Sequence, residues 1–550
     1  MRSLLRAPEA RILLASTWIA LFCNASYWLV IAAERPAGAL FAVRYFGGFL
    51  LLTIGLISLV LMLFAVGRAA RYVLCLSLLI AAATNFFLFR YGVVFDPGML
   101  TSIVETNSAE ALELMSWSLL AAIVVLGLLP AILLWRLPLA ERRLPVALLH
   151  RTLGIALALV LIAVPLASNQ KEIFSVARNH GELRHLITPL NVFSASYVTA
   201  RGRLEAPTEH RAIALDATHM SAATEQRKPI VHVLMIGETA RAASFSLNGY
   251  SRNTNPELAQ IEDVHFVAAS SCGTMTAVSL PCMFSIQEHS NFDREASRHE
   301  DNLLDIAQRA GYHIVWVDNG NSCKGVCARV ANRDTREVDQ PEICPEHACY
   351  DEILVVELQN LLQEVNGDTL IVLHQLGSHG PAYFRRYPDS FRTFLPDCRS
   401  ANFADCSQQE IANSYDNTIA YTDHVIASAV DALSAYSDRY DTSLLYVSDH
   451  GESLGEHNMY LHGMPYSLAP AEQTVVPMIA WLGDREWTNA AASGATCFGD
   501  DATTSVSHDN LFHTELGLLD IATAAYRPEL DILGPCNLFA QATERRELIM

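Results

Sequence analysis

Five long apolar runs within the first 168 residues constrain the fold of this chain more than any other feature. They are Ala10–Ala33, Phe49–Val66, Tyr72–Phe89, Leu119–Trp135 and Leu153–Ala167. A helix that crosses a bilayer needs about 20 predominantly apolar residues, and about 17 are enough. The first four runs meet that length and the fifth falls just short of it. A single run could be a buried core helix, but five in succession predict a transmembrane domain with five helices over residues 1–168.

Arginines flank these runs on one side of the predicted domain. They lie before or at the start of the first run, between the second and third, and between the fourth and fifth, as Arg2, Arg6, Arg11, Arg68, Arg71, Arg136, Arg142, Arg143 and Arg151. Basic residues concentrate in cytoplasmic loops, so we expect a cytoplasmic N-terminus and an exported C-terminal part. A cleaved signal peptide over residues 1–25 is the alternative. An uncleaved first helix fits the loop charges better, because export needs an odd number of spans.

The charge balance changes along the chain of 550 residues. The first 200 residues carry 15 Lys and Arg against 9 Asp and Glu, whereas the remainder carries 23 against 49. We expect residues 169–227 to form a polar linker with short helices along the membrane surface, and residues 228–550 to form the exported domain. For so acidic a domain we expect no nucleic-acid partner.

The cysteines agree with export. Of the 12, Cys23 and Cys75 lie in apolar runs and the other ten lie between 272 and 536. An even number of cysteines in an oxidising compartment indicates disulfides. Pairs close in sequence would be Cys272–Cys282, Cys323–Cys327, Cys344–Cys349, Cys398–Cys406 and Cys497–Cys536. Connectivity stays open at this point. A zinc ribbon is the competing explanation, but the spacings lack its C-x2-C regularity.

Short β-branched runs alternate with helical stretches after residue 228. The runs are 229–237, 312–318, 369–377, 443–451 and 475–483, and the helical stretches include 301–311, 351–365 and 411–436. Near-continuous apolar strands that alternate with helices predict a mainly parallel sheet covered on both faces. Ligands of such sheets bind beyond the carboxyl ends of the strands.

Carboxylates and imidazoles follow three of these strands. Glu238 follows the first strand, His379 follows the third, and Asp449 and His450 follow the fourth, with His457 and His462 further on. Alone, Glu238 could be a first-turn carboxylate of a helix, His379 a turn residue, Asp449–His450 a structural hydrogen bond and His457 a surface residue. Because they gather at one edge of the sheet, they favour a metal site. A mixed O/N ligand set suits zinc or manganese.

Six longer motifs resemble one known family. They are MIGETAR, SCGTMTAVSLPCMF, DNGNSCKGVC, HQLGSHGPAYFRRYP, YVSDHGESLGEHNMYLHGMP and SHDNLFHTELGLLDI. Together with the five-helix part and the order of the motifs, they resemble the bacterial phosphoethanolamine transferases that act on lipid A. That family belongs to the alkaline phosphatase and sulfatase superfamily. The resemblance covers almost the whole chain and implies a membrane domain followed by a superfamily α/β domain.

The resemblance also implies the site residues. The zinc ligands would be Glu238, Thr276, Asp449 and His450, and the phosphate contacts would be His379, His462 and Lys324. Thr276 would be the nucleophile and Thr274 its neighbour. The family allows a second metal ion, but the motifs offer no surplus ligands. The roles of Asn319 and Asn321 stay open, and the Cys323–Cys327 pair would mark a subgroup of the family.

The chemistry of threonine explains the need for a metal. A threonine hydroxyl is scarcely ionised at neutral pH, and a bound zinc ion would stabilise its alkoxide. The hypothesis is a two-step transfer from phosphatidylethanolamine to Thr276 and then to a lipid A phosphate, by a monomer in the inner membrane. This would lower the negative charge of the outer membrane and confer resistance to polymyxin and cationic peptides.

Two other functions compete with this one. The first is another enzyme of the same superfamily, one that modifies core sugars or uses phosphoglycerol. The second is a catalytically inactive relative that serves as a membrane sensor or assembly protein. The presence of Glu238, Thr276, Asp449 and His450 argues against the second.

Overall fold

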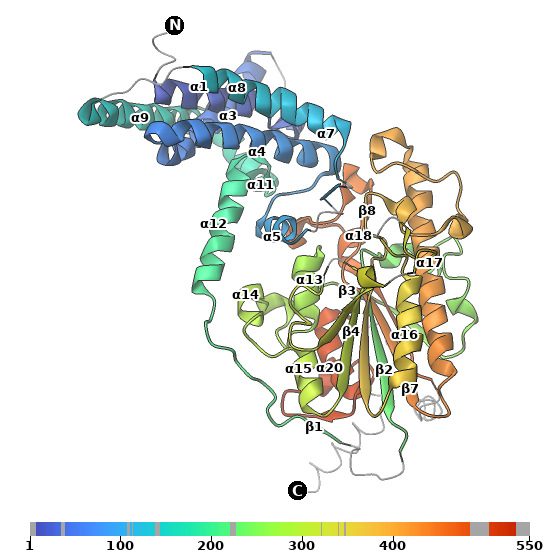
Figure 1. Cartoon of the computed structure of the whole chain (residues 1–550). Coiled ribbons are helices and arrows are strands. Elements are labelled where there is room, and N and C mark those ends of the chain that lie inside the picture. Colours follow the sequence, from blue (N-terminus) through green and yellow to red (C-terminus); the bar gives the residue numbers. More distant parts are fainter. Residues whose placement is uncertain are drawn as a thin grey trace. The chain divides into compact units, whose positions relative to one another are not determined.

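The computed structural model describes residues 7–34, 39–106, 111–112, 114–137, 143–220, 227–320, 322–338, 340–345, 348–483 and 505–534. The chain forms two compact units. One holds Met1–Leu100 and Met115–Arg201, and the other holds Thr101–Leu114 and Gly202–Met550. The first is helical and the second is an α/β domain (Figure 1). The boundaries expected at residues 168 and 227 stay a prediction.

Among the described residues of the first unit, four helical spans are long and apolar enough to cross a membrane. They are Phe41–Phe64 in α3 (Ala39–Phe64), Gly67–Tyr91 with α4 (Ala70–Tyr91), Trp117–Arg136 and Leu144–Ser168, which is α9. The third combines α7 (Trp117–Ala122), a π-helical turn (Ile123–Leu128) and α8 (Leu129–Arg136). A fifth span results if the bent pair α1 (Pro8–Phe22) and α2 (Ala25–Ala33) is one span.

The hydrogen bonds of a buried polar side chain, that of Asn24, explain the bend in the first apolar run. The helices α1 and α2 meet at 61°. The side chain of Asn24, at this break, donates to the carbonyls of Ile19 and Thr188 and accepts the N–H of Thr188. A buried amide must be hydrogen-bonded, and these partners require Asn24 to leave the helical path. Three further helices, α10 (Gln170–Asn179), α11 (Leu183–Leu186) and α12 (Leu190–Glu205), lie where short linker helices were expected.

The second unit is built on a seven-stranded sheet with the order β3-β10-β7-β2-β6-β4-β5. The strands are β2 (Ile230–Gly237), β3 (Val264–Ser270), β4 (His313–Asp318), β5 (Ala331–Asp334), β6 (Thr369–His374), β7 (Asp441–Ser448) and β10 (Val475–Trp481). The five strands from β7 to β5 are parallel. Strand β10 runs antiparallel to both of its neighbours. The predicted mainly parallel sheet is therefore confirmed, with an antiparallel pairing at one edge.

Helices cover both faces of this sheet. Figure 1 shows α16 (Glu352–Glu364) and α17 (Gln408–Ser434) on one side, and α15 (Leu303–Arg309) with α20 (Leu511–Leu518) on the other. The short helix α13 (Thr276–Met283) follows β3. Trp316, Phe284 and Leu234 are fully buried members of the core on the α15 side. Apolar burial on both faces makes the strands near-continuous apolar runs, which is why the sequence identified them.

Candidate active site and metal centre

The strand register brings two acidic residues together at the edge of the sheet. Strands β2 and β7 are parallel neighbours, and Gly237 pairs with Ser448. The next residue of each strand, Glu238 and Asp449, therefore leaves the sheet at the same level. The loop after β6 passes close by, because a Cβ on Gly377, at φ +55°, would lie 2.5 Å from the Glu238 carbonyl oxygen. Only glycine tolerates both this contact and this backbone conformation.

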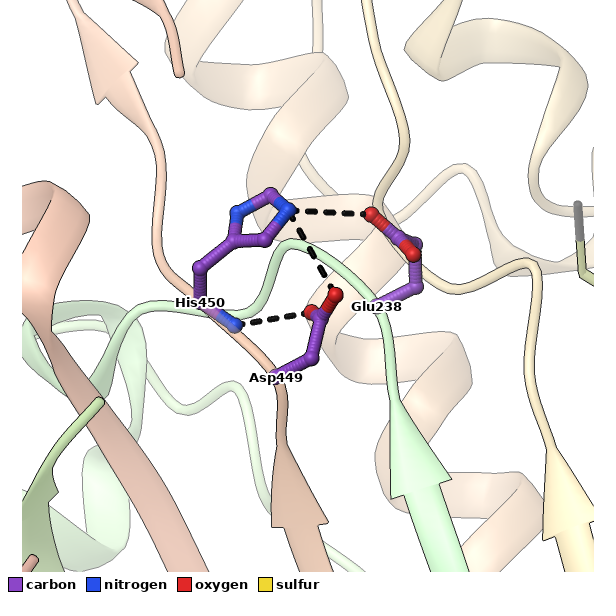
Figure 2. Close-up of side chains that lie close together, drawn as sticks. All are labelled: Glu238, Asp449 and His450. Carbon is purple, nitrogen blue, oxygen red and sulfur yellow. Dashed lines mark hydrogen bonds and ion pairs between the residues drawn. The ribbon is translucent and has the colours of Figure 1, made fainter. Parts of the chain in front are cut away.

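Glu238, Asp449 and His450 form a buried cluster (Figure 2). The Nε2 atom of His450 lies 3.4 Å from Glu238 Oε1 and 3.5 Å from Asp449 Oδ2. The other ring nitrogen, Nδ1, lies 3.0 Å from the carbonyl oxygen of Gly451. If Nδ1 donates its proton to that carbonyl, Nε2 has a lone pair directed at the two carboxylates. A histidine that binds a metal is held in this way.

The cluster fits a divalent cation. Within the described part of the chain, Asp449 Oδ2 is buried and has no hydrogen-bond partner. Burial by itself lowers the pKa of His450, but Asp449 and Glu238 outweigh it and raise that pKa to about 10. Two buried carboxylates thus demand positive charge beside them. Carboxylate oxygen and imidazole nitrogen atoms that all lie within 4.8 Å of one another form a donor set suited to zinc.

Thr276 brings a hydroxyl to this cluster. Its Oγ1 donates to Glu238 Oε2 at 2.9 Å and lies 3.4 Å from His450 Nε2. Thr276 is the first residue of α13 and is half-buried, whereas the three cluster residues are fully buried. Because the positive end of a helix dipole lies at its N-terminus, this position favours negative charge on a bound group.

Thr274 has a different role. Its hydroxyl donates to the carbonyl of Met464 at 2.6 Å, and its carbonyl accepts the N–H of Gly463 at 2.9 Å. Thr274 therefore attaches the loop before α13 to the segment around residue 464, and its hydroxyl is already engaged. The two threonines differ in geometry in a way that their spacing does not reveal.

His462 and His379 lie beside the cluster. The ring of His462 is 4.4 Å from that of His450 and 5.5 Å from that of His379, measured between centroids. His462 Nδ1 lies 2.8 Å from Glu452 Oε2, and the other oxygen of Glu452 accepts the hydroxyl of Tyr383 at 2.5 Å. This fixes the His462 ring and leaves Nε2 for a ligand. His457 is exposed.

The other expected residues lie outside this cluster. Lys324 is buried and lines a cavity in the same unit. Asn319 is structural, because its amide donates to Asp351 and Cys349 and accepts the hydroxyl of Thr335. Asn321 lies outside the described residues.

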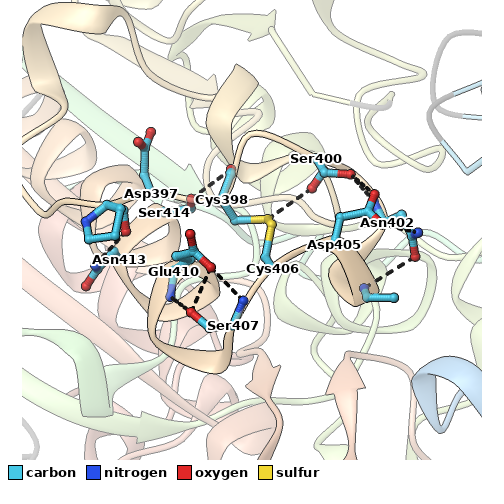
Figure 3. The surroundings of a disulfide bond; sticks show 12 residues. Asp397, Cys398, Ser400, Asn402, Asp405, Cys406, Ser407, Glu410, Asn413 and Ser414 are labelled. Carbon is cyan, nitrogen blue, oxygen red and sulfur yellow. Dashed lines mark hydrogen bonds between the residues drawn. A yellow bond between two sulfur atoms is a disulfide. The ribbon is translucent and has the colours of Figure 1, made fainter.

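Four expected cysteine pairs are bonded, namely Cys272–Cys282, Cys323–Cys327, Cys344–Cys349 and Cys398–Cys406. The pair Cys497–Cys536 lies outside the described residues. The last bonded pair stands beside the start of α17, where Ser407 and Glu410 form a reciprocal cap (Figure 3). Cys23 and Cys75 are free.

Several supporting residues escaped the sequence analysis. The Ser279 hydroxyl donates to the carbonyl of Asp449 at 2.5 Å and so links α13 to the buried cluster. Thr239 adopts φ +61°, an unusual conformation for a β-branched residue, and donates to both Glu238 and Asp449. The signal for Glu452 and Thr239 was their position next to the predicted ligands. His508 lies in the last of the six quoted motifs, but the sequence does not indicate that it bonds the backbone of Cys272 and Ser448.

Comparison with known proteins places this site in a family. Residues 231–521 match the sulfatase family profile, and residues 53–204 match that of phosphoethanolamine transferases EptA/EptB. The chain is 36% identical over 544 residues to phosphoethanolamine transferase EptA of Escherichia coli K12, covering 98% of this chain and 99% of the relative. It is also 36% identical over 526 residues to phosphatidylethanolamine transferase Mcr-1 of Escherichia coli, covering 94% of each.

A solved structure agrees over both units. The integral membrane protein lipooligosaccharide phosphoethanolamine transferase A of Neisseria meningitidis superimposes with a TM-score of 0.90 at 33% identity, covering 96% of this chain and 98% of the other. The same membrane helices and the same α/β domain therefore occur in both proteins. The chain is a multi-pass membrane protein and belongs to the phosphoethanolamine transferases of the alkaline phosphatase and sulfatase superfamily.

Proposed function

We propose that this chain transfers phosphoethanolamine from phosphatidylethanolamine to a phosphate of lipid A through a covalent adduct on Thr276. The position of the Thr276 hydroxyl, 2.9 Å from Glu238 and 3.4 Å from His450, supports this most directly. The names of two relatives, a phosphatidylethanolamine transferase and a lipooligosaccharide phosphoethanolamine transferase, support the choice of donor and acceptor class.

Glu238, Thr276, Asp449 and His450 would hold one zinc ion. The buried, unpartnered Asp449 Oδ2 and the Nε2 of His450 supply donors of the right type. When bound, zinc supplies positive charge that stabilises an alkoxide and the phosphoryl oxygens. We find no ligand set for a second ion among the described residues.

In the first step, the Oγ1 of Thr276 attacks the phosphorus of the donor and the ester bond to diacylglycerol breaks. Glu238 Oε2 is placed to accept the hydroxyl proton, and the departing diacylglycerol oxygen gains a proton. His462, oriented by Glu452, and the nearby His379 would contact the phosphoryl oxygens and move protons to leaving groups, while Lys324 would contact the donor phosphate.

In the second step, a phosphate oxygen of lipid A attacks the phosphorus of the adduct. The bond to Thr276 breaks, its oxygen regains a proton, and the product carries a diphosphate linkage to ethanolamine. Each step exchanges one phosphorus–oxygen bond for another, so the geometry that serves the first step serves the second in reverse.

The membrane unit and the cysteines support the cellular setting that we propose. We place residues 1–168 in the bacterial inner membrane with the N-terminus in the cytoplasm, residues 169–227 at the membrane surface, and residues 228–550 in the periplasm. The enzyme would act as a monomer. By covering phosphates with ethanolamine it would lower the negative charge of the outer membrane and so confer resistance to polymyxin.

Mass spectrometry of the purified chain after incubation with phosphatidylethanolamine tests the proposal. We expect a gain of one phosphoethanolamine on Thr276 and none in a Thr276→Ala variant, whereas Thr274→Ala retains the adduct. Lipid A from cells with and without the chain provides the second readout. A gain on lipid A supports the proposed acceptor, and a gain on the core sugars alone would overturn it in favour of the alternative transferase.

A further inference from the structure

A short hairpin carries His462 to the buried cluster. Its strands β8 (Ser453–Leu454) and β9 (Tyr460–Leu461) pair antiparallel, and His462 follows β9 directly. In the turn, His457 has φ +52° and Asn458 has φ +59°, a left-handed conformation that costs residues with side chains free energy. A two-stranded ladder of this length cannot hold such a backbone by itself, so contacts with the rest of the domain must hold it.

Glu456, also in the turn, connects the hairpin to the segment that follows β2. Its Oε2 accepts the N–H of Leu454 at 2.6 Å, and its Oε1 accepts Nη1 of Arg241 at 2.7 Å. Arg241 Nη1 also lies 3.4 Å from the carbonyl oxygen of Glu452. Arg241 therefore contacts the hairpin both at its turn and just before its first strand.

Arg241 is itself fixed in the loop that carries Glu238. Its backbone N–H donates to the hydroxyl of Tyr415 at 3.0 Å, and that hydroxyl donates to the carbonyl of Thr239 at 2.8 Å. Its Nε donates to Ser244 Oγ at 2.9 Å, and its guanidinium lies 5.4 Å from the centroid of the Tyr415 ring. These contacts orient the side chain of Arg241, so that the hairpin is attached to a rigid part of the site.

The Arg241–Glu456 pair is largely shielded from solvent. The side chain of Arg241 is 10% exposed and that of Glu456 is 29% exposed. Burial acts to raise the pKa of Glu456, but Arg241 outweighs burial and lowers that pKa, so Glu456 is charged at neutral pH. A charge-assisted hydrogen bond is stronger than a neutral one, and removal of either partner leaves the other unpaired.

Arg241 and Glu456 reach His462 only through neighbouring residues. Glu452, whose carbonyl faces Arg241, also holds His462 Nδ1 at 2.8 Å. The strand that pairs with Leu454 ends one residue before His462. Among the described residues, Arg241 hydrogen-bonds neither His462 nor the buried cluster, so any effect that it has on the reaction would act through position.

We infer that the Arg241–Glu456 pair is a positioning device, which fixes the hairpin so that the ring of His462 faces the phosphoryl group. The inference rests on the proposed function, which assigns phosphoryl contact and proton movement to His462. Arg241 is then a positioning residue and His462 is the group that touches the substrate.

Hydrogen–deuterium exchange of the full chain in detergent tests whether the pair fixes the hairpin. Glu456→Gln keeps the shape of the side chain and removes its charge. Since a hydrogen bond to a charged group contributes a free energy equivalent to about tenfold or more, we expect exchange over residues 453–462 to become about tenfold faster. Arg252→Gln is the matched control, because Arg252 also forms a partly buried pair, with Asp416 at 2.6 Å, and also lies over an aromatic ring, but makes no contact with the hairpin.

Single-turnover formation of the Thr276 adduct tests whether the pair positions His462. A displacement of about 1 Å in a catalytic group costs up to about 100-fold in rate, so we expect about tenfold slower adduct formation in Arg241→Gln and in Glu456→Gln. Both substitutions together should be no slower than either alone, because they break the same contact. Arg241→Lys, which keeps the charge, should restore part of the rate, and Arg252→Gln should react as wild type does.

A double-mutant cycle separates positioning from a general structural effect. In a His462→Ala background, Arg241→Gln should cause no further loss of rate, whereas a merely structural role would slow both backgrounds equally. Equal slowing in the two backgrounds, or a wild-type rate in Glu456→Gln, would overturn the inference. If the wild-type chain forms no adduct, the proposed function fails and exchange decides the inference: protection of residues 453–462 that depends on Glu456 supports it, and protection that does not would overturn it.

Discussion

A single buried histidine, His508, attaches the segment before Thr276 to the sheet. Protonation of this histidine at low pH should weaken that attachment. Its Nδ1 accepts the N–H of Cys272 at 2.9 Å, and its Nε2 donates to the carbonyl of Ser448 at 3.0 Å. It thus joins the segment before Thr276 to the end of β7. Burial, together with the nearby imidazoles of His450 and His289, lowers the pKa of His508 to about 3. Only the neutral ring can accept one bond and donate the other.

The size of the effect follows from linkage. The folded pKa lies below the unfolded value of about 6.5, so the contribution of His508 to stability is fully present above pH 6.5 and is lost as the pH falls toward 3. At pH 5 the unfolded chain binds a proton that the folded chain does not, which costs about 2 kcal/mol of unfolding free energy. Because the side chain is buried, solvent screening does not reduce this value.

The contribution of His508 to the unfolding free energy can be measured by denaturant unfolding of the full chain in detergent at pH 7 and pH 5. Tryptophan fluorescence reports the unfolding. We expect His508→Gln to be less stable than wild type at pH 7 by about 1–3 kcal/mol, since one buried partner loses its hydrogen bond. Its further loss between pH 7 and pH 5 should be about 2 kcal/mol smaller than that of wild type. His457→Gln, at an exposed position, should retain the wild-type pH dependence. An equal pH dependence in His508→Gln would refute the argument.

Three other substitutions test the supporting contacts. Glu452→Gln should lower kcat about 10-fold to 100-fold with little change in KM, because the ring of His462 loses its charged partner, and steady-state kinetics measure this. Thr274→Val should reduce the unfolding free energy by about 1–3 kcal/mol yet leave adduct formation intact in a single-turnover assay. Replacing both Cys398 and Cys406, which are eight residues apart, by serine opens their loop and should cost about 2–3 kcal/mol in denaturant unfolding. With a reductant present in both samples, the difference between wild type and variant should disappear.

Much of the α/β unit was predictable because its strands are apolar on both faces. The run 229–237 became Ile230–Gly237, and the run 312–318 became His313–Asp318. Two strands of the seven-stranded sheet were not predicted, because they lack this pattern. Strand β3 (Val264–Ser270) lies at the sheet edge with a partly exposed face, and β5 (Ala331–Asp334) is polar and mostly exposed. Neither has the continuous apolar pattern on which the prediction relied.

The first apolar run shows a feature that the local sequence does not predict, namely its bend. Composition identified Ala10–Ala33 as one segment, yet the chain bends after Phe22. The bend depends on Thr188, which is 164 residues away in sequence and supplies the hydrogen bonds of Asn24. A local pattern records that a residue is polar but not which distant partner satisfies it.

The sequence by itself determined the division into a membrane part and an α/β part, because apolar run length and strand periodicity are local properties. It also placed Glu238, Asp449 and His450 at strand ends, because parallel strands end at one edge. Only the tertiary structure distinguishes the surroundings of Thr274 and Thr276, since the hydroxyl of Thr274 binds a carbonyl and that of Thr276 faces the buried carboxylate of Glu238. The same holds for the cavity that Lys324 lines, because its walls come from segments as distant as Glu105 and Arg329, which meet only when the chain folds.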